Sequence, residues 1–196
     1  MQLTTTLPSL FVFSLALLAC SDPAPPIAQG GLHFYTTAPT PGVSGKTCTT
    51  SSYVVGIGNP PPALTGDDPG KRVVDGEKNN SVKCRVKGNG EVTFSGSIGG
   101  PNVLDTQSPY GVSFRINGNV GADGTGSAQV SLTTPKVGSL ASDGGCTVEG
   151  VVMNEKEQWG DGLVWAQFSC RSMVDPSYPG TLCSTGGTVV LENCED

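Results

Sequence analysis

The chain has 196 residues, of which 36% are apolar and only 6% aromatic, while 28 are glycine and 15 are proline. This composition fits one domain with a thin hydrophobic core, and the length does not favour a second domain. The formal net charge of −6 argues against nucleic acid or anionic lipid as a partner, because both attract basic surfaces.

The first nineteen residues are predicted to be an export signal. Residues 10–19 form an uncharged apolar run that is too short to span a bilayer as a helix but is typical of a signal-peptide core. No Lys or Arg precedes this run, which departs from the usual positively charged start of such signals. We therefore expect the chain to be exported.

The predicted signal ends in Leu17-Leu18-Ala19-Cys20, with an aliphatic residue three positions before a cysteine and a small residue directly before it. This arrangement resembles the lipobox of bacterial lipoproteins. The resemblance implies lipidation of the Cys20 thiol and cleavage before Cys20. Several acyl chains on one residue bind a membrane durably, so we expect a lipid-anchored protein of the bacterial outer membrane or cell surface. A plain secretory signal, with Cys20 unmodified, is the alternative.

Residues 20–31 are predicted to form the lipidated cysteine and a flexible tether. Proline and glycine are frequent there, and such segments do not pack as regular elements. The remaining residues, 32–196, are then expected to form a single β-sandwich domain.

The cysteines predict crosslinks. If Cys20 is lipidated, an even number remains, which suits three disulfides in an oxidising compartment. Apart from Cys20, Cys48 and Cys84 are the only cysteines in the first half of the chain, so we expect them to pair, and a Cys146–Cys170 bridge is also expected. Cys183 and Cys194 would then form the third bridge. The six disulfide cysteines are Cys48, Cys84, Cys146, Cys170, Cys183 and Cys194.

The sequence predicts no metal site and no cofactor. It contains no Cys-x-x-Cys, and its only histidine is His33, so a zinc site is not expected. Calcium in the loops is the competing idea, because Asp67-Asp68 and Asp123-Gly124 could supply oxygen ligands. Asp-Gly is first of all a turn signal, and we prefer a turn to a calcium site as the interpretation.

Apolar and polar residues alternate with a period of two through most of the chain, which predicts β-strands. The clearest example is 82–87, where Val82 and Val86 share one face and Lys83, Arg85 and Lys87 the other. We expect this basic stripe to pair with carboxylates on neighbouring strands. About nine or ten short strands favour an antiparallel β-sandwich, with a closed β-barrel as the alternative.

A C-terminal hairpin is predicted from the strand patterns at 146–153 and 163–170. If residue 158 is its centre, Cys146 and Cys170 face each other. Trp159 would then lie at the tip, where a partly exposed indole could stack on a sugar ring or anchor a protein contact. Trp165 lies mid-strand among apolar residues, so we expect it to be buried.

The chain resembles the small predicted lipoproteins without assigned activities that gliding, predatory bacteria encode in large numbers. The matching stretches are Leu17–Cys20, Arg72–Glu77, Ser81–Cys84, Trp165–Cys170 and Gly187–Cys194. The resemblance supports an exported location and a β fold. It brings no catalytic residues with it.

An enzyme is not the favoured interpretation, because no Gly-x-Ser-x-Gly elbow occurs and His33 would have to serve any Ser-His or Cys-His arrangement. We expect His33 to be an ordinary polar residue. The favoured function is a non-catalytic envelope or cell-surface lipoprotein that binds glycan or protein. The alternative is a periplasmic or surface hydrolase with a carboxylate-based site. Its candidate carboxylates are Glu77, Glu91, Glu149 and Glu192.

Overall fold

The computed structural model describes residues 27–38, 48, 50–56, 72–88, 91–104, 111–154, 162–176 and 178–195, and these residues contain strands and turns but no helix. No segment of that part is therefore a helix that could cross a membrane. The strands are β1 (Gln29–Thr37), β2 (Ser51–Val55), β3 (Val73–Val74), β4 (Ser81–Lys87), β5 (Val92–Gly100), β6 (Val112–Val120), β7 (Thr125–Thr134), β8 (Gly138–Ser142), β9 (Cys146–Asn154), β10 (Gly162–Asp175) and β11 (Tyr178–Cys194).

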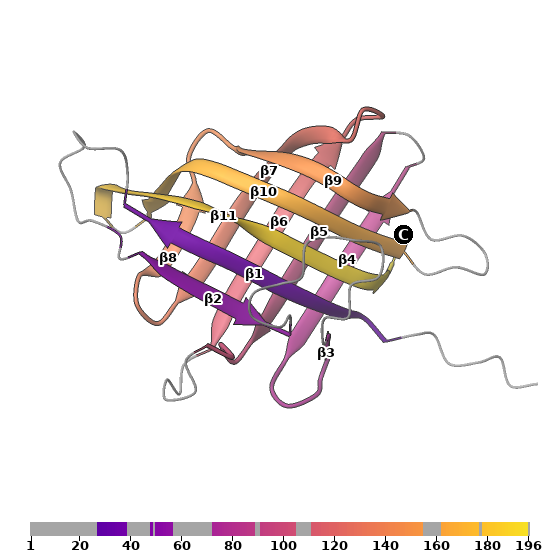
Figure 1. Ribbon diagram of the computed structural model, residues 1–196, viewed down its shortest axis with the longest axis horizontal. Helices are drawn as coiled ribbons and strands as arrows, with labels where there is room; N and C mark the ends of the chain where they lie inside the picture. Colours follow the sequence, from indigo (N-terminus) through magenta and orange to yellow (C-terminus); the bar gives the residue numbers. More distant parts are fainter. Residues whose placement is uncertain are drawn as a thin grey trace, which may run out of the picture.

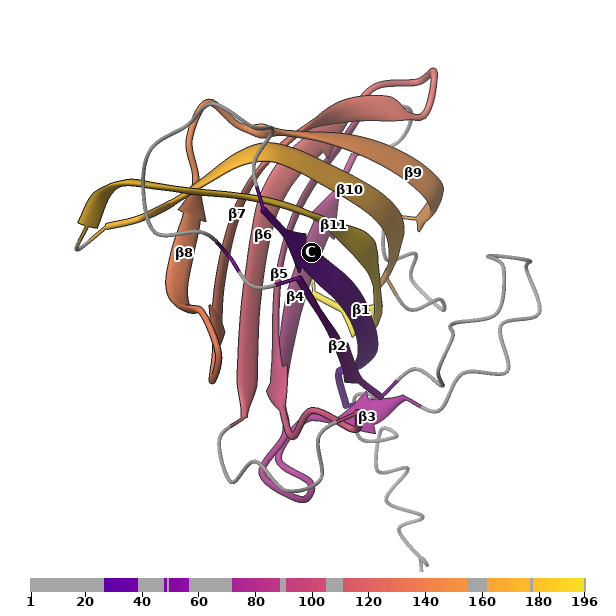
Figure 2. The same cartoon turned by 60° about the vertical axis from the view of Figure 1, so that its left-hand side comes forward.

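These eleven strands form one antiparallel sheet that folds over into two packed layers (Figure 1). The hydrogen-bonded order is β2-β1-β11-β10-β8-β7-β6-β5-β4, and β9 pairs with both β10 and β7. We call β1, β2 and β9–β11 the front layer and β4–β8 the back layer. Figure 2 shows the front strands curving over the back strands. The prediction of an all-β, antiparallel fold is confirmed, and the sheet does not close into a clean barrel, because β2 and β4 remain its two ends.

The strand that sequence reasoning missed is β8. It is only five residues long, and Leu140 is its one fully buried side chain, so its pattern carries little signal. It nevertheless joins the layers, because it pairs with β7 in the back layer and with β10 in the front layer.

Alternation places the core between the layers. On β4, buried and exposed residues alternate without exception, and the same pattern continues across β5 and β6. Three aromatic rings connect the layers: Phe34 of β1 lies 6.1 Å from Phe114 of β6, and Phe114 lies 5.0 Å from Phe168 of β10, measured between ring centroids. Although the chain has few aromatic residues, burial of these three rings contributes strongly to the stability of the core.

Strand β1 begins at Gln29, inside the segment predicted to be tether. Gly30 explains why this glycine-rich stretch packs. A Cβ at Gly30 would lie 2.7 Å from the carbonyl oxygen of Val190 and 3.1 Å from the Leu191 side chain. The glycine therefore allows β1 to lie close against β11, and the folded domain starts a few residues earlier than expected.

Three disulfides brace the sheet, and one of the expected pairs is confirmed. Cys146 of β9 is bonded to Cys170 of β10. Next to this bridge the strands keep the predicted register about residue 158, with Thr147 opposite Ser169. A register shift between Trp165 and Ala166 then alters the pairing toward the hairpin tip.

The other two expected pairs, Cys48–Cys84 and Cys183–Cys194, are wrong. Cys48 is bonded to Cys183 and Cys84 to Cys194, with Cα–Cα distances of 5.4 and 4.8 Å. The reason is the length of β11. Cys194 is the last residue of β11, and Cys183 lies eleven residues before it on the same strand. Eleven extended residues span about 36 Å, so the two thiols cannot meet.

Candidate functional site

The outward surface of the front layer contains a hollow of about 730 Å³. Strand register explains its lining. Two rows of side chains cross the layer from β1 through β11 and β10 to β9, one row starting at His33 and the other at Tyr35. The first row is His33, Thr188, Gln167 and Glu149, and the second is Tyr35, Gly186, Ser169 and Thr147. We call this surface the Tyr35 hollow.

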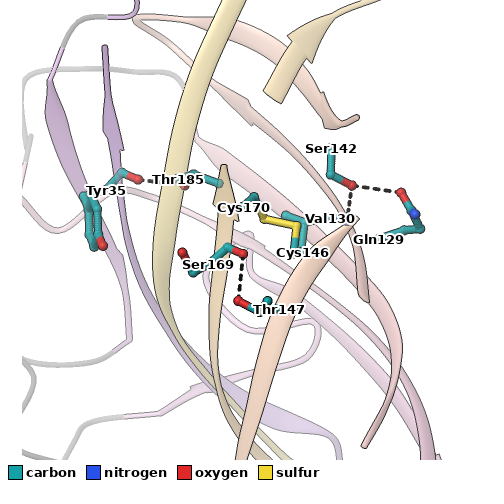
Figure 3. The surroundings of a disulfide bond; sticks show 9 residues. All are labelled: Tyr35, Gln129, Val130, Ser142, Cys146, Thr147, Ser169, Cys170 and Thr185. Carbon is teal, nitrogen blue, oxygen red and sulfur yellow. Dashed lines mark hydrogen bonds between the residues drawn. A yellow bond between two sulfur atoms is a disulfide. The ribbon is translucent and has the colours of Figure 1, made fainter. Parts of the chain in front are cut away.

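Tyr35 lies open on the sheet, with 43% of its surface exposed. Gly186 of β11 makes room for its ring, because a Cβ there would lie 2.7 Å from the Tyr35 hydroxyl and 3.0 Å from Cζ. The hydroxyl of Thr185 donates a hydrogen bond of 2.7 Å to the Tyr35 carbonyl oxygen and holds the strand in place (Figure 3). An accessible aromatic ring is thus presented on a rigid support.

The Cys146–Cys170 disulfide lies directly beneath this hollow. Thr147 and Ser169, the neighbours of the two cysteines, point outward into it, and the Thr147 hydroxyl donates a hydrogen bond of 3.3 Å to the Ser169 carbonyl oxygen (Figure 3). The bridge therefore fixes β9 against β10 where their hydroxyl side chains line the surface.

His33 contributes a neutral imidazole to the hollow. Partial burial lowers the pKa of His33 below the usual histidine value, because the charged form loses hydration. The uncharged ring offers one hydrogen-bond donor and one acceptor at neutral pH. Together with the amide of Gln167 and the carboxylate of Glu149, it gives the hollow both donors and acceptors beside an aromatic ring.

Trp165 is buried, as expected, but it does not belong to the main core. It is 4% exposed and packs with Val54 and Val190, with Leu163 at their edge. These side chains are on the outward side of the front layer, because their strand neighbours Ala166, Val189 and Val55 face the main core. Among the residues that the structure describes, none accepts a hydrogen bond from the indole N–H of Trp165.

Several predicted site residues lie outside the described part of the chain: Cys20, Trp159, Asp67 and Asp68. The other calcium candidate, Asp123, caps the turn between β6 and β7. Its carboxylate accepts hydrogen bonds from the backbone N–H and the hydroxyl of Thr125, which lower the pKa of Asp123. No group of three or more His, Cys, Asp or Glu side chains that could hold a metal occurs among the described residues.

The four candidate carboxylates of a hydrolase lie on separate elements. Glu77 is in the turn after β3, Glu91 precedes β5, and Glu149 and Glu192 lie on β9 and β11. Strand and register spacings place the last two roughly 16 Å apart, farther than the two carboxyl groups of a glycosidase. Glu192 is also engaged, because it accepts a hydrogen bond from Gln29 at 2.7 Å and pairs with Arg72 at 3.3 Å.

The outward surface of the back layer carries the basic stripe. The expectation that the stripe pairs with neighbouring carboxylates is wrong for Lys83 and Lys87, because their partners across β5 are Ser97 and Thr93. Arg85 does form an exposed ion pair, at 3.5 Å, with Glu195, which follows the last strand. The physical reason is that β5 presents only Ser and Thr opposite these cations, while the other edge of β4 has, within the described residues, a single isolated bridge, to Glu195.

Sequence reasoning also missed Tyr35. The residue lies in a short segment of uncertain strand character, and its ring became a candidate only once β11 lay beside β1. A usable signal was the Gly186-Gly187 pair, since adjacent glycines inside a strand often mark a close approach of another group.

Comparison with known proteins adds no further identification. No protein-family model matches the chain, and no curated protein or solved structure matches it.

Proposed function

We propose that this chain is an exported, non-catalytic envelope or cell-surface lipoprotein whose β domain binds a glycan in the Tyr35 hollow. The observation that carries the proposal is the exposed ring of Tyr35 over Gly186, next to a row of polar side chains. A sugar ring presents an apolar C–H face and a rim of hydroxyl groups. An aromatic platform beside hydrogen-bonding groups suits both features.

Three further observations support the proposal. The three disulfides are compatible with an oxidising, exported location. The hollow is lined by side chains of strands in one face of the sheet, and such a surface suits binding of an extended ligand. The wide separation of Glu149 and Glu192 supports a non-catalytic role, because a pair of carboxylates at catalytic distance is missing from these strands.

A glycan array with purified mature protein tests the binding proposal. We expect a subset of glycans to be retained and Tyr35→Ala to weaken their binding about tenfold, since the stacking surface is lost. Tyr35→Phe should retain most of the affinity, because it keeps the ring. Lys136→Gln, in the turn between β7 and β8 and away from both outward surfaces, is the control and should bind like the wild type. Retention of no glycan, or equal binding by Tyr35→Ala, would contradict the proposal.

The lipid anchor is tested separately. Metabolic labelling with a fatty-acid analogue should label the wild type and not Cys20→Ala, because the thiol is the acylation point. The labelled protein should fractionate with membranes, and Ser21 after the cysteine suggests the outer membrane. Labelling that persists in Cys20→Ala would refute this part of the proposal while leaving glycan binding unaffected.

A further inference from the structure

We infer that the outward surface of β4–β6 is a second binding face, which takes an acidic polysaccharide. It lies on the layer opposite the Tyr35 hollow and does not depend on the function proposed for that hollow. Four side chains define it, and we call them the basic face: Lys83, Arg85 and Lys87 of β4 and Arg115 of β6. All four are exposed.

Charge is segregated between the layers. The strands β4, β5, β6, β7 and β8 contain no Asp or Glu, although the chain as a whole is acidic with a net charge of −6. The sheet register aligns Lys83, Ser97 and Arg115 in one row across three strands. Neighbouring strands are about 4.8 Å apart, so this row holds two cations with a hydroxyl group between them.

Most of the basic face is free of ion pairs. Arg85 is paired with Glu195, but both side chains are largely exposed, and such pairs contribute little. Lys83, Lys87 and Arg115 form no ion pair within the described part of the chain. The nearby Asp75 accepts a hydrogen bond of 2.8 Å from the Val82 backbone N–H and forms no ion pair with these cations within the described residues.

The basic face is concave. Lys83, Arg85 and Arg115 line a hollow of about 730 Å³. These three cations exceed the two carboxylate residues of its lining, Asp75 and Glu195. A second hollow of about 390 Å³ adjoins it on the β7–β8 side. Both hollows share Ser97 and Arg115, so they form one continuous depression across the strands. A depression of this form fits an extended polymer chain better than it fits the flat surface of a bilayer.

Unused polar groups lie between the cations. Ser95, Ser97 and Asn117 form no side-chain hydrogen bond within the described residues. Toward the far edge of the same layer, by contrast, polar side chains bond to one another, as Ser142 does to Gln129 at 2.9 Å. Free donors and acceptors are therefore concentrated where the cations are.

This combination points to a polysaccharide with carboxylate or sulfate groups. The cations would pair with its acidic groups, and the free hydroxyl and amide groups would bond to its sugar hydroxyls. Single-stranded nucleic acid fits less well, because the phenylalanines of β4–β6, Phe94 and Phe114, are buried and leave no aromatic platform for base stacking.

The experiment measures binding of purified mature protein, in a neutral detergent, to immobilised polygalacturonate. Its fully methyl-esterified form has the same backbone without the charges and serves as the ligand control. The test variant is Lys83→Gln with Arg115→Gln. The protein control is Lys136→Gln with Arg171→Gln, which removes the same charge from the β7–β8 turn and from β10. Thermal unfolding verifies that both are folded.

We expect binding to polygalacturonate that weakens with added salt, and almost none to the methyl ester. The test variant should lose about tenfold in affinity, and the control less than twofold. If the test variant does not fold, Ser95→Glu, which places a carboxylate among the cations, should give the same loss. Any of three results would overturn the inference. They are binding to the methyl ester as tight as to polygalacturonate, a loss of affinity in the control variant equal to that in the test variant, and tighter binding to duplex DNA or phosphatidylglycerol vesicles at the same salt.

Discussion

The two outward surfaces of this folded sheet differ in chemistry although they share one backbone architecture. The front surface carries Tyr35, the half-buried His33 and a cluster of buried apolar side chains around Trp165. The back surface carries cations and hydroxyl groups, and its aromatic residues all face the core.

The difference shows that the period-two pattern has different consequences in the two layers. In the back layer, every outward position of β4 is exposed, so alternation separates core from solvent. In the front layer, Trp165 is outward by register but is 4% exposed. An outward position is therefore open to a ligand on the back layer but is not always open on the front layer.

The largest expected effect concerns the bond that ties the two layers together. Replacing Cys84 and Cys194 by Ser should lower the free energy of unfolding by about 4.7 kcal/mol, because this bridge closes a loop of 110 residues. The Cys146–Cys170 bridge lies within the front surface and closes only 24 residues, so its removal should cost roughly 3.4 kcal/mol.

Urea unfolding under non-reducing conditions measures both differences. A larger loss from the Cys146–Cys170 pair than from the Cys84–Cys194 pair would mean that the front surface, and not the junction of the layers, depends most on its crosslink.

The next effect tests whether the front surface is partly closed. Trp165→Ala should lower the free energy of unfolding by about 3–5 kcal/mol, as expected for emptying a buried aromatic site. Gln167→Ala, two residues along on the same face but exposed, is the control and should change it by less than about 0.5 kcal/mol. Denaturant unfolding gives both values. A Trp165→Ala loss as small as that of the control would show that the front surface is as open as the back.

The smallest effect concerns the pH response of the front surface, since the back surface has no histidine. The pKa of His33 is lowered in the folded state, so the unfolded chain takes up this proton first as the pH falls. Stability should therefore be fully present above pH of about 6.5 and should decline as the pH falls below that value, levelling off below the folded-state pKa.

Thermal unfolding between pH 7.5 and 5 measures this response, and His33→Gln should show a shallower decline than the wild type. Identical curves for the two proteins would place His33 in a more hydrated environment than the structure indicates. Comparison with His33→Gln separates the histidine contribution from that of the carboxylates, which titrate in both proteins.

The sequence by itself determined the class of fold and the local pairing. Alternation over 82–87 assigned core and outward faces correctly, because neighbouring side chains on a strand must point to opposite sides. The hairpin centre at residue 158 predicted the Cys146–Cys170 bridge, since two strands joined by one turn have their register set by that turn.

Only the tertiary structure decided which distant strands became neighbours. It placed β11 between β1 and β10, which created the Tyr35 hollow, and it brought Cys194 beside Cys84 at the edge of β4. It also left Lys83 facing Ser97 and not a carboxylate. The physical reason is that alternation encodes which face of a strand is apolar, whereas the order of strands depends on how the whole set of apolar faces can be buried together.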